Sequence, residues 1–375
     1  MISNYAPAIP WVGLFIVFEW HLIWAAMSGM ETLLHALIAT GVLSALKLNS
    51  RRYLPLGLLA GISVWVRPDG LTLLGPLALM VIIKEGDTPS RLRGLMRILI
   101  GFGSIFLFYL LFNLLIGDTP MPNTFYAKQA EYAAWQERTI FERLGDLSLQ
   151  LFAGPFFLVS VGAIVWVVRS FRERSWGSLL ALAWSLGYMF IYILRLPVYQ
   201  HGRYVMPAMP VLFLMGLFAV IEFSGSKTFG RYQWFVKTLW QSGIAAMSIL
   251  FIFLGAYTYA RDVALIEQEM VVTAKWAAAN LPSDAVVAAH DIGALGYFDE
   301  HPLIDLAGLI SPEVVPFIRD EARLTEFLNE RDADYLIDFS NLYENMVQGK
   351  EAVFVAGGPM TQDEGVAPMT IYRWK

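Results

Sequence analysis

Apolar stretches alternate with polar loops from Trp11 to Tyr259, and most are close to the roughly 20 residues that cross a hydrocarbon core of ~30 Å. We expect membrane helices over residues 11–27, 32–46, 95–116, 149–168, 176–194, 204–223 and 235–259. Two shorter pieces, 54–66 and 71–83, fall below the usual span. They either thin the bilayer locally or form a hairpin that sinks the loop between them into the membrane.

The loops are of two kinds, which alternate along the chain. One kind is rich in Lys and Arg and should be cytoplasmic, because positive charge favours that side: Lys47, Arg51, Arg52; Lys84, Arg91, Arg93, Arg97; Arg169, Arg172, Arg174; Lys227, Arg231, Lys237. The other kind carries unusual motifs: Ser28-Gly-Met-Glu31, Arg67-Pro-Asp-Gly70, Pro122-Asn-Thr-Phe-Tyr-Ala-Lys128 and His201-Gly-Arg-Tyr204. These motifs should share the opposite, extracytoplasmic face.

Composition supports this interpretation. Hydrophobic residues make up 57% of the chain and charged residues 16%, and the mean hydropathy is +0.53, as in an integral membrane protein. A net charge of −5, with the basic residues spread over loops, gives no reason to expect a nucleic-acid partner. Without cysteine the chain has no disulfides and no thiolate metal site.

The pattern changes at Arg261 to that of a soluble α/β domain. We predict helices over 263–280 and 321–330 and strands over 285–289, 303–306, 335–339, 352–356 and 369–374. The sequence therefore divides into a multi-pass membrane domain, residues 1–262, with an outer-face cleft, and a soluble extracytoplasmic α/β domain, residues 263–375. In the long loop before Ser148, apolar positions 140, 141, 144 and 147 predict an amphipathic helix, either lying on the membrane surface or covering a cleft as a lid.

Three candidate residues lie in the first two motif loops, and a fourth, His35, lies in the predicted helix that follows the first loop. Arg67 and Asp69 flank Pro68 at a helix break, and are either a mutually satisfied ion pair or a site at which Arg67 holds a phosphate. Glu31 stands four residues before His35, on the same helical face, so the two could bind a divalent metal. The alternative makes Glu31 a polar residue at the rim of an outer cleft.

Three further groups are candidates for substrate binding. His201, Arg203 and Tyr204 lie on the side where cations are disfavoured, so they either bind an anion or extend to the membrane interface. Asn123, Tyr126 and Lys128 follow two prolines, which should stiffen an extended segment. His290 and Asp291 follow a predicted strand, where α/β domains hold ligands; a local His–Asp hydrogen bond in a turn is the alternative.

Together, Ser28-Gly-Met-Glu-Thr32, Arg67-Pro-Asp-Gly70, Pro122-Asn-Thr-Phe-Tyr-Ala-Lys128, Gly202-Arg-Tyr-Val-Met-Pro207, His290-Asp-Ile-Gly-Ala-Leu-Gly296 and Ile304-Asp-Leu-Ala-Gly308 resemble the bacterial GT-C glycosyltransferases. The arabinofuranosyltransferase-like and dolichyl-phosphate-mannose mannosyltransferase-like branches are the most similar. The resemblance implies a polytopic enzyme of the bacterial cell membrane. It would transfer a sugar from a polyprenyl-phosphate donor to an extracytoplasmic glycan, lipid or protein acceptor, with inversion. Arg67, His201 and Arg203 would then contact the donor phosphate, and Asn123, Tyr126 and Lys128 would shape the cleft.

The chain departs from that family in one respect. Its members carry one or two acidic residues in a first outer loop, as catalytic base or metal ligand, and no such loop precedes Trp11. Glu31 and Asp69 are the outer-side carboxylates that could substitute, although neither matches the family's catalytic position. We therefore expect a truncated copy that binds its donor and transfers sugar poorly. The alternative function is a non-enzymatic protein that binds or flips lipid-linked sugars.

Overall fold

The computed structural model describes residues 11–48, 50–152, 156–197, 199–225, 227–339, 342–359, 362, 365 and 367–375. Contacts between residues divide the chain into two compact units. The first, the helical unit, comprises residues 1–116 and 135–256; the second, the α/β unit, comprises residues 117–134 and 257–375. The chain passes from the helical unit into the α/β unit, returns, and passes into it again.

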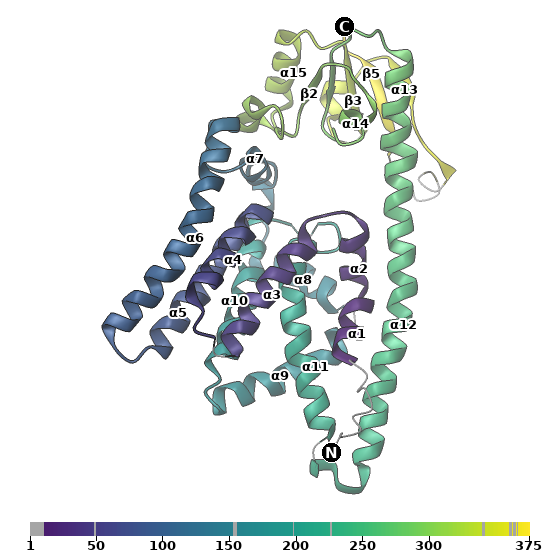
Figure 1. The fold of residues 1–375 in the computed structure, drawn as a ribbon. Coiled ribbons are helices and arrows are strands. Elements are labelled where there is room, and N and C mark those ends of the chain that lie inside the picture. The colour runs from purple at the N-terminus through teal and green to yellow at the C-terminus, as the bar shows by residue number, and fades with distance from the viewer. Residues whose placement is uncertain are drawn as a thin grey trace, which may run out of the picture. The chain divides into compact units, whose positions relative to one another are not determined.

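The helical unit is built from helices that run back and forth (Figure 1). They are α1 (Trp11–Phe18), α2 (Trp20–Met27), α3 (Thr32–Lys47), α4 (Tyr53–Val66), η1 (Pro68–Leu73), α5 (Leu74–Lys84), α6 (Thr88–Gly117), α8 (Ile140–Phe152), α9 (Phe156–Arg172), α10 (Trp176–Arg195), η3 (Met206–Ala208), α11 (Met209–Gly225), η4 (Lys227–Tyr232) and α12 (Gln233–Leu265).

Three helical stretches in the described part of the chain are long and apolar enough to cross a membrane: 88–117, 176–195 and 230–280. Only 11% of the most apolar window of the last stretch is buried inside the protein, which leaves the remainder to contact lipid. The chain is therefore mostly helical, with helices long and apolar enough to cross a membrane, as the sequence predicts. The helices at 32–47, 53–66 and 206–222 are apolar but shorter.

The single helix expected over 11–27 is wrong, because the helix breaks at Glu19. This residue adopts an extended conformation, its carboxylate accepts a hydrogen bond from the backbone N–H of Leu22 (3.1 Å), and it caps the first turn of α2. His21 donates to the same carboxylate across 2.6 Å. A buried carboxylate must be satisfied, and a helix N-terminus next to it satisfies it better than a continuous helix could.

Successive helices carry the basic loops to one end of the helical unit and the motif loops at Glu31, Arg67 and His201 to the other, whereas the motif at 122–128 lies in the α/β unit. Helix α3 begins after Glu31 and ends at Lys47, α4 returns to Arg67, and α5 ends at Lys84. Helix α10 runs from Trp176, beside the basic Arg174, back to the motif end at Arg195. Residues that are distant in sequence thus gather into two separate sets.

Glycines allow α4 and α6 to pack closely. A Cβ atom added to Gly57 would lie 2.3 Å from the carbonyl oxygen of Ile98, and one added to Gly101 would lie 2.4 Å from that of Leu54. Close backbone approach of this kind is how small residues hold membrane helices together. It fixes α4, and with it the Arg67 turn at the end of α4.

The amphipathic helix predicted around residues 140–147 is α8, and a buried arginine docks it on α10. Arg143 donates to the carbonyl oxygens of Ile193 (3.1 Å) and Leu194 (3.2 Å), in the last turn of α10. These carbonyls have no partner within their own helix, so Arg143 supplies one.

The α/β unit contains a five-stranded sheet of order β2-β1-β3-β5-β4. Strands β1 (Val287–Ala289), β2 (Leu303–Asp305) and β3 (Tyr335–Phe339) are parallel, and β5 (Met369–Arg373) is antiparallel to both β3 and β4 (Ala352–Val355). Six helical elements complete the C-terminal part: η5 (Ile266–Val271), α13 (Val272–Asn280), α14 (Leu295–Phe298), η6 (Pro312–Phe317), α15 (Glu321–Glu330) and α16 (Glu344–Val347). The predicted strands and the helix at 321–330 are confirmed.

Apolar side chains cover both faces of the sheet. Ala288 and Leu336 pack on the side of α15, whereas Val287, Ala289 and Ile337 pack on the side of α13 (Figure 1). Both sets are fully buried, which is the pattern of a parallel sheet held between two helical layers. The helix expected to start at 263 instead continues from α12 without a break, through the π-helical turn η5.

Residues 117–134 add helix α7 (Asn123–Glu131) and the start of η2 (Ala133–Glu137) to the α/β unit. Ala127 of α7 is 1% exposed, and Ala130 packs against the sheet face that also bears Leu336. The sequence placed this segment in the membrane domain; its contacts belong to the other unit.

Candidate functional site

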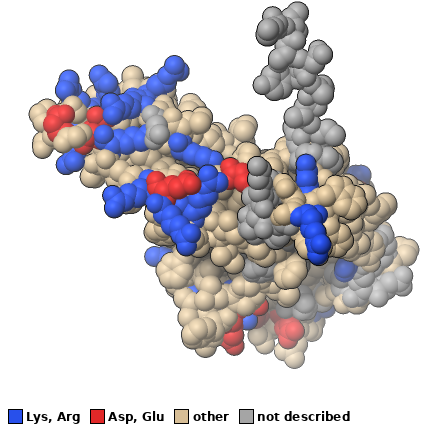
Figure 2. Space-filling model, turned by 90° about the horizontal axis from the view of Figure 1, so that it is seen from below, with Lys and Arg blue, Asp and Glu red and all other residues tan. Residues whose placement is uncertain are grey.

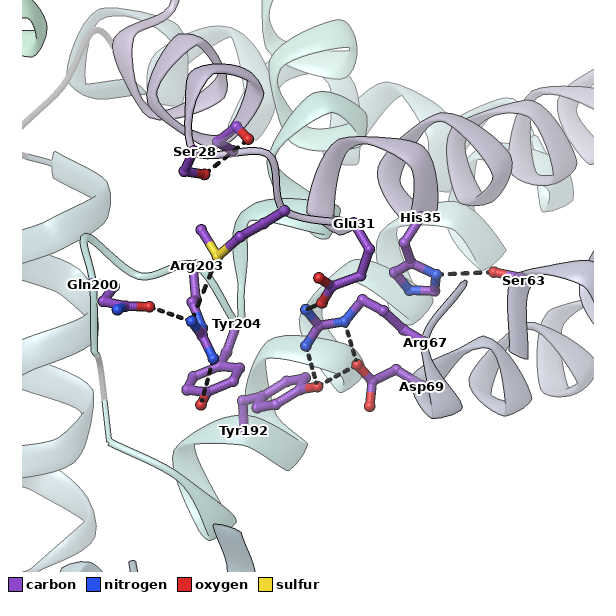
Figure 3. Close-up of polar contacts among 12 residues, drawn as sticks. Ser28, Glu31, His35, Ser63, Arg67, Asp69, Tyr192, Gln200, Arg203 and Tyr204 are labelled. Carbon is purple, nitrogen blue, oxygen red and sulfur yellow. Dashed lines mark hydrogen bonds and ion pairs between the residues drawn. The ribbon is translucent and has the colours of Figure 1, made fainter. Parts of the chain in front are cut away.

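Arg67 is the centre of a polar cluster at the motif end of the helical unit (Figure 3). Helix α4 ends at this residue, which adopts an extended conformation before the Pro68 turn. Its side chain is only 9% exposed. Nε donates to Asp69 (2.9 Å), Nη1 to Glu31 (2.7 Å) and Nη2 to the hydroxyl of Tyr192 (3.2 Å). All three guanidinium nitrogens therefore have protein partners, and two of these are carboxylates.

Asp69 is held on several sides. Besides Arg67, its Oδ2 atom accepts hydrogen bonds from the hydroxyls of Tyr188 (3.2 Å) and Tyr192. The two tyrosines are four residues apart on α10 and so share one face of that helix. A carboxylate with these three donors is a fixed structural anchor, which leaves it little freedom to exchange protons with a substrate.

Glu31 differs from Asp69 in its exposure. Its side chain is 48% exposed, against 24% for Asp69. One oxygen, Oε1, accepts the hydrogen bond from Arg67, and Oε2 has no partner among the described residues. Arg67 thus fixes a carboxylate that still faces outward, the arrangement that a general base requires.

Arg203 is the second guanidinium group of the cluster. Its Nη1 atom donates to the side-chain oxygen of Gln200 and lies 3.4 Å from the sulfur of Met30, and Nη2 donates to the hydroxyl of Tyr204 (3.3 Å). In the described part of the chain no carboxylate lies within 4.0 Å of it. Its Nε atom is buried without a hydrogen-bond partner. A partly buried cation with neutral partners only can bind an anion.

Tyr204 joins the two guanidinium groups. The Arg67 Cζ atom lies 5.9 Å from the centre of the Tyr204 ring and the Arg203 Cζ atom 4.9 Å from it. The ring also stacks on Tyr192, with 5.4 Å between centroids. Met30, which contacts Arg203, precedes Glu31 in the chain. The exposed carboxylate and the cation without a carboxylate partner therefore belong to one cluster (Figure 3).

An unusual turn presents Arg203. Gln200, His201 and Gly202 have φ angles of 46°, 56° and 75°. The left-handed conformation costs on the order of 1 kcal/mol or more for a residue other than glycine, so two such residues in succession indicate a conformation maintained by its surroundings. The His201 ring packs against the rings of Trp20 and Trp24, at centroid distances of 5.6 and 5.0 Å.

The metal alternative for Glu31 and His35 finds no matching geometry. Glu31 binds Arg67, whereas His35 Nδ1 is hydrogen-bonded to the hydroxyl of Ser63 at 2.9 Å. Within the described ranges, no group of three or more His, Asp or Glu side chains could hold a metal ion.

The α/β unit has its own polar cluster, at the carboxyl ends of its parallel strands. Strand β2 lies on one side of β1, and β3 lies on the other side. The strand order therefore reverses between β1 and β3, and parallel sheets commonly bind ligands at such a switch point. His290 follows β1 directly. Its Nδ1 atom is 2.8 Å from the hydroxyl of Tyr343 and its Nε2 atom 3.2 Å from Glu131 of α7. Tyr343 and Glu131 thus contact the ring, in place of the local bond to Asp291 considered above.

Burial and charge oppose one another at this cluster. Burial alone lowers the pKa of His290, but the hydrogen bond and the negative charge of Glu131 outweigh it, so the pKa of His290 is raised. Burial raises the pKa of Asp291. It also raises the pKa of Asp338, near the end of β3, to about 7, although the backbone N–H of Tyr343 donates to this carboxylate. The edge therefore carries one carboxyl group, that of Asp338, which exchanges its proton near neutral pH.

The prolines at 120 and 122 have a different effect from the one expected. The predicted extended segment is wrong. Asn123, Tyr126 and Lys128 all lie in helix α7, and Pro122 is the N-cap residue of this helix. Proline is well tolerated at the start of a helix, because its fixed φ suits the first turn. The structure places these residues in the α/β unit, which also contains the His290 cluster. It brings Glu31, Asp69, Arg67, Arg203 and Tyr204 together in the helical unit.

Comparison with known proteins reaches only the α/β unit. Residues 260–370 match the model of a family described as a domain of unknown function, DUF8728. No curated protein matches the chain. The DUF8728 match takes in His290, Asp291 and the whole sheet, apart from the last residues of β5.

Several residues of both clusters escaped the sequence analysis. Tyr188 and Tyr192 could have been found, because two hydroxyl groups four residues apart lie on one face of an apolar helix. Glu131 gave a weaker signal, since it is an acidic residue three positions after the motif that ends at Lys128. No sequence pattern indicated Asp338 and Tyr343, because only the fold of the sheet places them beside His290.

Asp338 provides a pH prediction for the α/β unit. Its pKa is about 7 when folded and about 4 when unfolded. Between about pH 4 and pH 7, Asp338 is therefore protonated in the folded protein and ionised in the unfolded chain. The free energy of unfolding consequently falls as the pH rises through this window and is highest below pH 4. We expect the free energy of opening of the β3 amides to fall by about 1 kcal/mol per pH unit across this window. Hydrogen exchange, corrected for its intrinsic pH dependence, measures it.

The Asp338→Asn variant removes this titration and should flatten the slope. The difference between wild type and variant isolates Asp338 from other groups that titrate in the same range. An identical slope in the two proteins would contradict the raised pKa.

Proposed function

We propose that this protein is a GT-C-like membrane glycosyltransferase that moves a sugar from a polyprenyl-phosphate donor to an extracytoplasmic glycan, lipid or protein acceptor. One observation carries the proposal. A half-exposed carboxylate, Glu31, fixed by a buried arginine, shares a cluster with a guanidinium group, Arg203, that has no carboxylate partner among the described residues.

These two groups match the two needs of the reaction. The acceptor hydroxyl attacks the anomeric carbon, and its proton passes to Glu31 as general base. The bond between the anomeric carbon and the phosphate oxygen breaks, and polyprenyl phosphate leaves with the bonding electrons. Arg203 stabilises the charge on the departing phosphate with its planar donor fork. Attack opposite the leaving group inverts the anomeric centre.

Arg67 and Asp69 have positioning roles in this proposal. Arg67 orients Glu31, and Asp69 with its tyrosine donors orients Arg67. His201 and Tyr204 support the turn that presents Arg203. We assign Asn123, Tyr126 and Lys128 of the α/β unit to substrate binding, as the family resemblance implies. His290 and Asp291 are assigned to it because they follow strand β1, where α/β domains bind ligands. The alternative function, binding or flipping of a lipid-linked sugar, requires the anion site and no base.

The proposal requires the motif end to be extracytoplasmic, which cysteine labelling tests because the chain has no cysteine of its own. Single cysteines at the exposed positions Arg51 and Arg93 should resist a membrane-impermeant thiol reagent in intact cells, because we place the basic loops in the cytoplasm. Cysteines at the exposed Thr124 and Ser283 should react. The reverse pattern would exclude an extracytoplasmic acceptor.

Arg203 should contribute a charged hydrogen bond to the donor phosphate. Arg203→Ala is expected to weaken binding of undecaprenyl phosphate by about 1.5–3 kcal/mol, and Arg203→Lys should recover little, because a lysine lacks the planar fork. Arg138→Ala is the matched control, since Arg138 is 42% exposed and paired with Asp146 at 2.9 Å. Titration of the purified variants measures the loss. If the control lost as much affinity as Arg203→Ala, we would abandon the anion site.

Glu31 should determine the rate rather than the binding of the donor. Glu31→Gln is expected to lower the transfer rate by about 10²- to 10⁴-fold and to leave undecaprenyl phosphate affinity near that of the wild type. The assay follows transfer from polyprenyl-phosphate mannose or arabinofuranose to an envelope extract. Donor binding without transfer by the wild-type protein would favour the non-enzymatic alternative, and unchanged transfer by the variant would place the base elsewhere.

A further inference from the structure

The basic end of the helical unit contains a hollow of about 450 Å³. Three separate chain segments form it: the end of α3, the end of α5 and the turn between α9 and α10. Its lining includes Lys47, Lys84, Arg174, Ser175 and Trp176. Figure 2 shows Lys and Arg side chains gathered on this face. The volume lies within the range of small-ligand sites, which begins near 300 Å³.

The three cations of the hollow form no ion pair with a carboxylate in the described residues, although Glu222 attracts Lys47 and Glu85 attracts Lys84 at longer range. No Asp or Glu oxygen lies within 4.0 Å of Lys47, Lys84 or Arg174 among the described residues. The acid on the rim, Glu173, is already bonded to Arg169 at 2.7 Å. The Lys84 ammonium nitrogen is shielded from solvent, and the described residues offer it no hydrogen-bond partner. A buried ammonium group without a partner is costly, so the hollow is suited to an anion.

Helix α10 adds to this positive potential. It begins at Trp176, in the wall of the hollow, and its N-cap residue Ser175 makes no capping hydrogen bond with its side chain. The N-terminus of a 20-residue helix carries a partial positive charge, which favours an anion beside it. Gly177 allows this terminus to approach α3, since a Cβ atom there would lie 2.6 Å from the Lys47 Cα.

An apolar groove adjoins the hollow, and Lys47 lines both. The groove runs between α3, α9, α10 and α11, and its walls include Leu43, Ala181, Leu214, Met215 and Phe218. The Lys47 ammonium nitrogen lies 4.2 Å from the centre of the Trp166 ring and 5.3 Å from that of Phe218. A basic hollow next to an apolar groove matches an amphiphilic ligand, which has a charged head group and an apolar chain.

We propose that this end of the helical unit binds an anionic phospholipid, with its phosphate between Lys47, Lys84 and Arg174 and an acyl chain in the groove. Basic pockets between membrane helices bind lipid head groups in this manner. The site is distinct from the Arg203 cluster, because α3 separates Lys47 from Glu31 by sixteen residues, about 24 Å of helix. A bound lipid would join the ends of α3, α5 and α10.

The experiment measures binding of three probes to the full chain purified in a neutral detergent: dioleoyl phosphatidylglycerol, dioleoyl phosphatidylcholine and glycerol 1-phosphate. Native mass spectrometry counts bound lipid, and thermal unfolding reports its effect. Wild-type protein should retain phosphatidylglycerol, and its unfolding temperature should rise. Phosphatidylcholine and glycerol 1-phosphate should bind weakly, the first because its head group carries a compensating cation and the second because it has no acyl chain.

Substitution localises the site. Each of Lys47→Gln, Lys84→Gln and Arg174→Gln should weaken phosphatidylglycerol binding by about fivefold, and the triple variant should abolish the thermal shift. The matched control replaces Arg52, Arg93 and Arg172 by Gln, which removes the same charge from the same end without touching the hollow. Should the triple variant fail to fold, the three single variants provide the measurement.

Three outcomes would overturn the proposal. Equal losses in the control and in the hollow variants would mean that general attraction to a basic face explains the binding. Equal binding of phosphatidylcholine would remove the role of the cations. Equal binding of glycerol 1-phosphate would replace the lipid with a free phosphate ligand.

Discussion

The proposed catalytic cluster of the helical unit depends on one desolvated charge, the guanidinium group of Arg67. Its burial would be prohibitive in isolation, and the structure offsets it with two carboxylates and a tyrosine hydroxyl from three separate helical segments. Removing one partner from such a group typically costs about 3–5 kcal/mol. The same bonds that satisfy Arg67 fix Glu31 and draw Tyr192 and Tyr204 together. The hydrogen bonds that compensate for the burial of Arg67 therefore also assemble the proposed catalytic site.

The two ends of α3 illustrate how one helix can serve two chemistries. At its N-terminus a carboxylate is fixed beside a cation; at its C-terminus Lys47 stands between a basic hollow and an apolar groove. Hydrophobic packing between the ends, including the glycine contacts of α4 with α6, requires no polar group. Polar function is confined to helix ends because backbone and side-chain polarity can be satisfied there without breaking the apolar middle.

The α/β unit is assembled from two distant parts of the chain. Helix α7, from the loop after α6, brings Glu131 to His290, and Ala127 and Ala130 provide its apolar contact. Glu131 raises the pKa of His290 against the effect of burial. The segment 117–134 is therefore a structural part of this unit, although the DUF8728 match covers only residues 260–370.

The sequence by itself determined the membrane character, the alternation of basic and motif loops, and nearly every strand of the α/β unit, because hydrophobic periodicity and charge bias are local properties. It predicted Arg67 and Glu31 separately and left their roles open. Only the tertiary structure decided that Arg67 binds Glu31 and Tyr192, since these partners lie 36 and 125 residues away in the sequence. It also decided that α1 and α2 are separate helices and that α7 belongs to the α/β unit. These outcomes follow from the need to satisfy buried polar groups, which no local pattern encodes.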